Sequence, residues 1–192
     1  MGFEHSKIEK GVRLILEGIG EDLSREGLKR TPERIAEYYE EVLSGYTADP
    51  ATELRKYTTS NKDEMIILKD ISFYSLCEHH LLPFFGKVHI AYIPRNDKVA
   101  GFSNMVNVID ILSHRLQVQE RMTSEIADSM VKALNSKGVL VIVEAEHLCL
   151  TMRGIKKPGS RIVTSAVRGM LRNNTTRNEA LTLIGRGSIA FP

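Results

Sequence analysis

The stretch MIILKDISFYSLCEHHLLPFFGKVHIAYI, residues 65–93, decides the fold, because two strand-like segments flank a polar motif. Residues 65–68 and 71–74 form the first segment and residues 87–93 the second, and both are rich in β-branched and aromatic side chains. Together they predict a pair of antiparallel strands. The Cys77-Glu78-His79-His80 motif lies in the connection between them. Loops held by a rigid sheet often carry chemistry.

Helical patterns precede this strand pair. Apolar side chains recur at helical spacing over residues 7–18, and Thr31 followed by Pro32 predicts the N-cap and the first position of a second helix. These two helices are expected to form an N-terminal layer. Residues 45–61 are polar and rich in turn formers, which predicts an irregular connection.

Two further helices are expected after the strand pair. Ser103 predicts the cap of the first helix. Its apolar stripe comprises Met105, Ile109, Leu112 and Leu116. The stripe of the second helix comprises Met122, Ile126, Met130 and Leu134.

The C-terminal third predicts more strand and one short helix. A β-branched run over residues 139–143 indicates a strand that can extend to Met152, with a turn at Pro158-Gly159. Residues 176–179, Thr-Arg-Asn-Glu, match a capping box that opens a C-terminal helix. The order helix, helix, strand, strand, helix, helix, strand, strand predicts an α+β fold, with an antiparallel sheet and helices on one face.

Composition limits the class of protein. A chain of 192 residues with 42% hydrophobic content is sufficient for one globular domain and a helical appendage. We expect an N-terminal helical region over residues 1–60 and a catalytic domain over residues 61–192. A net charge of +2, the absence of Trp and 6% aromatic content do not favour nucleic acid as a partner. No apolar run is long enough to span a membrane, and the charged N-terminus MGFEHSKIEK lacks the apolar core of a signal peptide. The expected location is therefore the cytoplasm.

Both cysteines of the chain are candidate metal ligands. Thiols in a reducing compartment are more often metal ligands or catalytic groups than disulfides. Cys77-x-x-His80 has the spacing that lets one tight turn offer two ligands, and Cys149 would be the third. Such a set leaves one position of a tetrahedral zinc open, as in catalytic sites. Two alternatives stay open: a structural zinc with His79 or His147 as fourth ligand, and two buried thiols without metal.

Two other segments carry candidate functional groups. If residues 141–153 are extended, His147, Cys149 and Arg153 share one face. His147 could then exchange protons beside the metal, and Arg153 could hold an anion. The alternatives are a histidine that bonds a backbone carbonyl and a solvated arginine. Gln119 and Glu120 could bind the donor edge of guanine, although such polar clusters are usually solvated helix junctions.

Taken together, these segments resemble the GTP cyclohydrolase I family, which has the tunnelling fold. The resemblance covers nearly the whole chain. The resemblance rests on residues 77–84, 89–94, 115–121, 147–149 and 152–154, with supporting matches at residues 31–34, 164–166 and 168–169. It implies a four-stranded antiparallel sheet with two helices on one face. It also implies homodecamers with active sites at subunit interfaces.

The family resemblance further implies a zinc-dependent hydrolase that opens the imidazole ring of GTP at C8. The products would be formate and 7,8-dihydroneopterin triphosphate, on the route to folate and related pterins. Cys77, His80 and Cys149 would hold Zn²⁺, and His147 and His79 would be catalytic. Five further residues would contact the substrate: Ser103, Gln119, Glu120, Arg153 and Arg34.

One segment departs from the pattern of that family. Where the family usually has Ser-Lys-x-x-Arg, the chain has Ser103-Asn104-Met105-Val106-Asn107, and Glu37 replaces a common lysine. Charge-assisted contacts to phosphate contribute about 1.5–3 kcal/mol each. Two alternatives therefore remain beside GTP hydrolysis. One is a paralogue whose guanine substrate carries fewer or no phosphates, and the other is a non-catalytic purine- or pterin-binding assembly.

Overall fold

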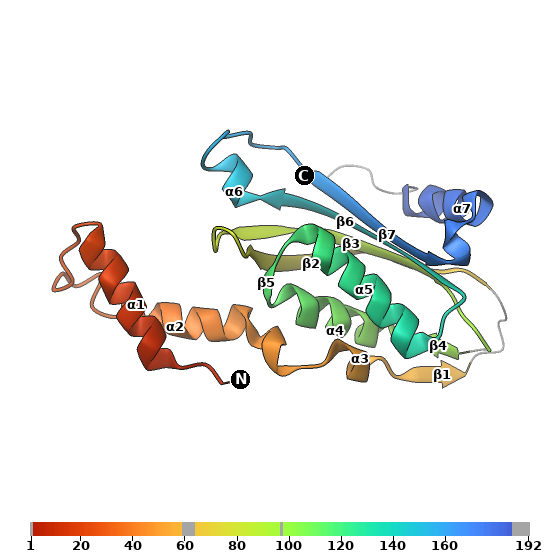
Figure 1. Cartoon of the computed structure of the whole chain (residues 1–192), viewed down its shortest axis with the longest axis horizontal. Coiled ribbons are helices and arrows are strands. Elements are labelled where there is room, and N and C mark those ends of the chain that lie inside the picture. The colour runs from red at the N-terminus through yellow and green to blue at the C-terminus, as the bar shows by residue number, and fades with distance from the viewer. Residues whose placement is uncertain (1, 59–63, 97, 186–192) are drawn as a thin grey trace.

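The computed structural model describes residues 2–58, 64–96 and 98–185. A sheet with the strand order β5-β2-β3-β6-β7 forms its centre (Figure 1). Its four long strands are antiparallel neighbours: β2 (Ile66–Cys77), β3 (Pro83–Ile93), β6 (Gly138–His147) and β7 (Ile162–Gly169). The predicted strand pair and the predicted antiparallel sheet are therefore confirmed. The additional strand, β5 (Leu116–Gln117), runs parallel to the end of β2 and is too short to show a periodic pattern.

Two helices cover one face of the sheet and enclose the main core. They are α4 (Phe102–Ser113) and α5 (Gln119–Leu134), and the predicted stripe of α5 is completely buried. Met105, Ile109 and Leu112 of α4 are buried as predicted, whereas Leu116 lies in β5 and is only half-buried. These apolar faces pack on the alternating side chains of β3 and β6. The structure confirms the α+β class.

The opposite face of the sheet carries a helix that the sequence did not place there. After β7, the short helix η2 (Met170–Arg172) leads into α7 (Asn174–Gly185). Leu171, Ala180 and Ile184 pack with Ala91, Ile93 and Leu140 in a second, smaller core. Alternation explains this second core, because side chains one residue out of phase point to the other face of a strand.

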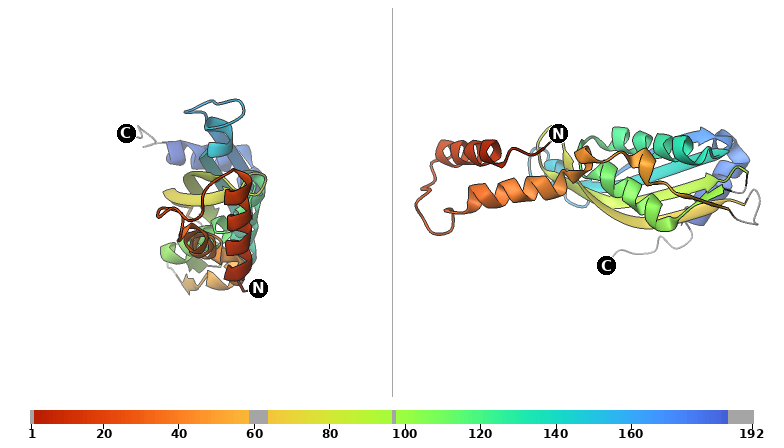
Figure 2. Two further views of the ribbon diagram at one scale, coloured as in Figure 1. Left: turned by 90° about the vertical axis from the view of Figure 1, so that its left-hand side faces the viewer. Right: turned by 90° about the horizontal axis from the view of Figure 1, so that it is seen from below.

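The N-terminal layer is a helical hairpin that extends away from the sheet (Figures 1 and 2). It comprises α1 (His5–Gly18) and α2 (Thr31–Val42), and no residue of α1 is buried. The chain then forms η1 (Ser44–Thr47), α3 (Pro50–Glu53) and β1 (Lys56–Thr58), and β1 pairs with β4 (Lys98–Ala100). The predicted irregular connection thus contains short elements up to residue 58. The division at residue 60 stays a prediction. Among the described helices, none has the length and apolar character needed to cross a membrane.

Several predicted element ends are corrected. Arg30 and Gly101, and not Thr31 and Ser103, occupy the cap positions of α2 and α4. The predicted capping box at residue 176 lies inside α7, where the Thr176 hydroxyl donates to the carbonyl of Met170. Asn173 accepts a bond from the backbone N–H of Thr175 instead. A local side-chain hydrogen bond therefore marks the start of α7, whereas the caps of α2 and α4 make no side-chain bond.

The largest correction concerns the strand expected to run from residue 139 to Met152. β6 ends at His147, and residues 148–151 form the helical turn α6 (Leu148–Thr151). Cys149 and Arg153 therefore do not continue the face of β6. The expected extended phase holds only as far as His147.

Candidate active site

The three predicted metal ligands meet at one end of the sheet. Cys77 is the last residue of β2, and its carbonyl accepts bonds from the backbone N–H groups of His80 and Leu81. This tight turn, with Leu81 at a positive φ of 55°, brings His80 back to Cys77. Cys149 comes from α6, directly after β6. Because β3 pairs with both β2 and β6, the ends of these two strands lie on either side of it.

The donor atoms of this set fit a divalent metal with a preference for thiolate and imidazole. The donor atoms of Cys77, His80 and Cys149 all lie within 4.8 Å of one another. Sγ of Cys77 is 3.8 Å from Nδ1 of His80, which compares with about 3.6 Å for two ligands of a tetrahedral zinc. Cys77 is buried, Cys149 half-buried and His80 exposed, so the site has a dry wall and an open side.

The protonation of the thiols depends on the metal. Burial raises the pKa of the Cys149 thiol, and the neighbouring Cys77 raises it further. The thiol of Cys149 therefore resists ionisation in the absence of a cation. A bound divalent cation reverses this preference and favours both thiolates.

His147 lies in the inner wall of the site. It ends β6, is 8% exposed, and stacks on Phe84 with ring centroids 4.6 Å apart and an interplanar angle of 4°. Its Nε2 is 2.7 Å from Oε1 of Gln119. Burial lowers the pKa of His147, whereas the nearby carboxylate of Glu120 acts in the opposite direction. Glu120 follows Gln119 at the start of α5, and the contact between Gln119 and His147 places this turn of the helix beside the histidine.

Gln119 occupies a different environment from the one expected for a substrate ligand. Its side chain is buried, and the two N–H groups of Nε2 are shared among three acceptors, the carbonyls of Val143 and Ile162 and Oγ1 of Thr164. Both N–H groups of the amide are therefore occupied within the chain, and Oε1 faces His147. A direct bond from this amide to guanine would require these contacts to break. Glu120 is exposed and has no such constraint.

His79 lies in the outer wall of the site. Its Nδ1 is 4.0 Å from Sγ of Cys77, and its Nε2 is 3.9 Å from a carboxylate oxygen of Glu78. The guanidinium of Arg121 forms an ion pair with Glu78, and this hydrogen bond lowers the pKa of the Glu78 carboxyl. Glu78 is thereby held as an anion beside His79.

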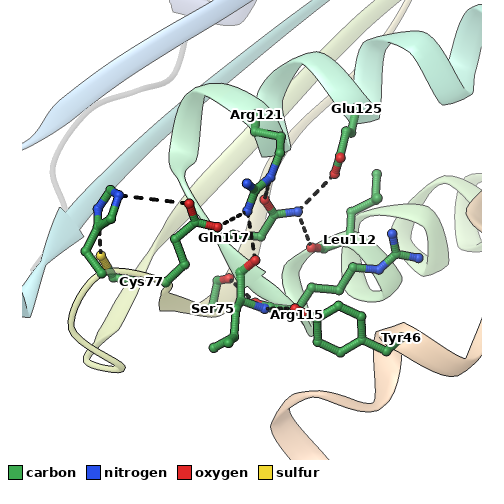
Figure 3. Close-up of polar contacts among 11 residues, drawn as sticks. Tyr46, Ser75, Cys77, Leu112, Arg115, Gln117, Arg121 and Glu125 are labelled. Carbon is green, nitrogen blue, oxygen red and sulfur yellow. Dashed lines mark hydrogen bonds and ion pairs between the residues drawn. The ribbon is translucent and has the colours of Figure 1, made fainter. Parts of the chain in front are cut away.

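A second set of contacts fixes Arg121, as Figure 3 shows around Gln117. Arg121 also donates to the carbonyl of Leu116 and to Oε1 of Gln117. Gln117 is buried and donates to the carbonyl of Leu112 and to Glu125. Glu78 and Arg121 were not among the predicted site residues. Their positions within the 77–80 motif and one helical turn after Gln117 were the available signals.

Of the remaining predicted residues, Arg153 lies near the metal ligands, whereas Ser103 and Arg34 lie apart from them. Arg153 is exposed just beyond α6, close enough for its charge to act on the Cys149 thiol. Ser103 lies at the start of α4, which follows β4 in the chain. Figure 1 shows β4 and α6 at opposite ends of the sheet. The 12 residues of α4 span about 18 Å along the helix axis, which separates Ser103 from the other end of the helix. Arg34 is exposed on α2 of the N-terminal hairpin. The described chain thus does not bring Ser103 and Arg34 to the metal site.

A family model for GTP cyclohydrolase I matches residues 8–185. The chain belongs to the GTP cyclohydrolase I family. It is 55% identical over 186 residues to GTP cyclohydrolase 1 of Carboxydothermus hydrogenoformans, with 96% of this chain and 97% of that protein covered. It is 57% identical over 183 residues to GTP cyclohydrolase 1 of Pelotomaculum thermopropionicum, with 95% and 97% covered. GTP cyclohydrolase 1 of Desulforamulus reducens is 51% identical over 183 residues, with 95% and 98% covered.

Membership of the GTP cyclohydrolase I family confirms the resemblance found in the sequence. The matched region includes all three residues of the Cys77, His80 and Cys149 cluster. These three donors come from two segments about seventy residues apart in the sequence, and the fold brings them together. The roles of the individual site residues remain predictions.

Proposed function

We propose that the protein hydrolyses GTP, opening the imidazole ring of guanine at C8 to give formate and 7,8-dihydroneopterin triphosphate. The observation that carries this proposal is the meeting of a Cys/His/Cys donor set with His147 and Glu120 at one end of the sheet. Cys77, His80 and Cys149 would hold zinc, which supplies Lewis-acid chemistry and a lowered pKa for water.

The chain's own residues then bind and move protons. The exposed carboxylate of Glu120 accepts hydrogen bonds from N1–H and the exocyclic amino group of guanine. His147, buried and held in place, delivers a proton to N7 as the ring opens. His79, open to solvent and next to the Glu78 carboxylate, exchanges protons in the later ring-opening and sugar steps. Arg153 attracts the anionic part of the substrate.

The same proposal includes assembly into a homo-oligomer, with the decamer as the expected form. Ser103 lies at the far end of α4 from the metal ligands. A site that uses both therefore requires Ser103 from a second copy of the chain. Arg34 on the extended hairpin is a further candidate for contribution across such an interface. The cytoplasm is the proposed location.

A second candidate function concerns the substrate's phosphates. α4 contains no Lys or Arg, and its first two turns present Ser103, Asn104 and Asn107. Glu37 is exposed one turn after Arg34. A guanine compound with fewer phosphates would suit this uncharged surface.

Turnover of GTP, GMP and guanosine by the zinc-loaded full-length protein separates these alternatives. We expect formate and pterin fluorescence from GTP, with His147→Ala reducing both. Efficient turnover of GTP alone would eliminate the variant substrate. Ligand binding without turnover of any purine would favour the non-catalytic assembly.

A further inference from the structure

A closed network of hydrogen bonds surrounds the side chain of Gln119. The Nε2 atom of Gln119 is 3.0 Å from each of three acceptors: the carbonyl oxygens of Val143 and Ile162, and Oγ1 of Thr164. Its Oε1 is 2.7 Å from Nε2 of His147. The network thus ties the first turn of α5 to β6 and β7, behind the histidine.

The chemistry of these partners fixes the orientation of the amide. Carbonyl oxygens only accept hydrogen bonds, so the NH₂ end of Gln119 must face Val143 and Ile162. The reverse orientation would place the amide oxygen 3.0 Å from two carbonyl oxygens in a buried environment, where neither carbonyl could receive a hydrogen bond from it. Oε1 must therefore face His147.

The hydrogen bonds of two threonines, Thr123 and Thr164, are consistent with this orientation of the Gln119 amide. The Thr123 hydroxyl donates to the backbone carbonyl of Gln119 at 2.7 Å, so its oxygen is available as an acceptor. Thr164 lies 2.7 Å from Thr123 Oγ1 and can donate to it, while its own oxygen accepts from Gln119. Each hydroxyl proton then has one acceptor.

The orientation of Gln119 determines which nitrogen of His147 carries hydrogen. An amide oxygen only accepts, so the 2.7 Å contact requires an N–H at Nε2 of His147. In the neutral ring, Nδ1 is then the basic nitrogen. The parallel stack on Phe84 fixes the plane of the ring, and the bond to Gln119 fixes its rotation in that plane.

We infer that Gln119 is a positioning residue that holds His147 as the Nε2–H tautomer and leaves Nδ1 as the nitrogen that first takes up a proton from water and then passes it to the substrate. This inference rests on the proposed function for the role of His147, but the tautomer itself does not. It differs from the guanine contact expected for Gln119, because it assigns the amide to turnover and not to substrate affinity.

Neutron diffraction from crystals of the zinc-loaded full-length protein tests the tautomer directly. At a pD of about 8, above the ordinary pKa of histidine, we expect deuterium on Nε2 of His147, pointing at Oε1 of Gln119. Deuterium on Nδ1 with a bare Nε2 would overturn the inference. This map is independent of activity, so it stands even if the proposed reaction fails.

Kinetics of two substitutions test the consequence. Gln119→Met has similar length but offers no comparable acceptor, so kcat for GTP should fall about 10–100-fold, less than the roughly 10²–10⁴-fold loss expected when the acid–base group itself is removed. Zinc content should be unchanged, and KM should stay within about threefold, since base recognition belongs to Glu120. Unchanged kcat, or a loss confined to KM, would contradict the positioning role.

Gln119→Glu provides the conservative rescue. One carboxyl oxygen can still accept from His147, and the other can carry a proton for the neighbouring carbonyls. We expect a kcat at least about fivefold above that of Gln119→Met, because the acceptor is restored. Equal losses in both variants would count against the inference. If His147→Ala retains full activity, the proposed function of His147 is wrong, whatever the neutron map shows.

Discussion

The two histidines beside the metal ligands lie in contrasting walls of the site. His147, in the inner wall, is 8% exposed, stacked on Phe84 and bonded to Gln119 at 2.7 Å. The side chain of His79, in the outer wall, is 64% exposed, and its contacts to Glu78 and Cys77 are 3.9 and 4.0 Å long. The inner wall is therefore preorganised by one chain, whereas the outer wall depends on exposed groups.

The difference in burial between His147 and His79 indicates that the two histidines have different roles. A buried histidine held by a ring stack and one hydrogen bond has one geometry before the substrate arrives, which suits a proton transfer that needs accurate alignment. An exposed histidine adjusts its position and can serve more than one step. Substitutions in each wall test these different roles, and the metal ligands, which both walls share, should be the most sensitive.

Loss of a metal ligand should have the largest effect. Cys149→Ser should lower the zinc content and reduce formate release from GTP about 10³-fold or more, because Lewis-acid stabilisation contributes several kcal/mol. Zinc per chain by elemental analysis and formate release check this. Full activity after complete removal of zinc by a chelator would contradict it.

Removal of the inner histidine should have the next largest effect. His147→Ala should lower kcat about 10²–10⁴-fold, the usual range for a general acid–base group, with zinc content retained. His79→Ala is the matched comparison in the outer wall, and we expect a smaller loss, since solvent can replace an exposed proton carrier. Equal losses measured by steady-state kinetics would remove the distinction between the two walls.

Loosening of the outer wall should have a moderate effect. Arg121→Met removes the ion pair with Glu78 and should lower kcat about tenfold or less, because partly exposed pairs are weak. The side chains of Arg121 and Glu78 are 41% and 34% exposed. Arg168→Met is the control, since Arg168 pairs with Asp128 and lies opposite Val139, far along β6 from His147. A similar loss in both variants would indicate a general effect on folding.

The smallest effect is expected at the uncharged start of α4. Asn107→Arg adds a cation to an exposed surface, and we expect KM for GTP to fall about threefold, a modest value because solvent screens the charge. KM for guanosine should not change. A lower KM for both compounds would show that the added charge does not act on phosphate.

The sequence predicted the parts of the fold that carry strong periodic signals. The strand-like segments on either side of residues 77–80 predicted β2 and β3, and the apolar stripe from Met122 to Leu134 predicted α5. The extent of β6 was wrong because apolar and polar side chains still alternate over residues 148–153, although with the opposite phase from Val141, Val143 and Ala145, and the chain turns into α6. Periodicity cannot separate a strand from a single helical turn of this kind.

The candidate metal ligands were also predictable, because Cys77 and His80 share one turn and only one other cysteine exists. The role of Gln119 was not, since its four partners come from β6, β7 and the histidine itself. Hydrogen bonds between distant segments leave no local pattern in a sequence. Likewise, the distance of Ser103 from the metal ligands follows only from the direction of α4.

The central claim is that the cluster of Cys77, His80 and Cys149 serves a guanine ring-opening reaction. Its most direct test measures zinc, formate and 7,8-dihydroneopterin triphosphate in the same sample of full-length protein turning over GTP. We predict one zinc per chain and equal molar amounts of formate and pterin. Zinc bound at one per chain, with GTP bound but neither product formed, would contradict the claim.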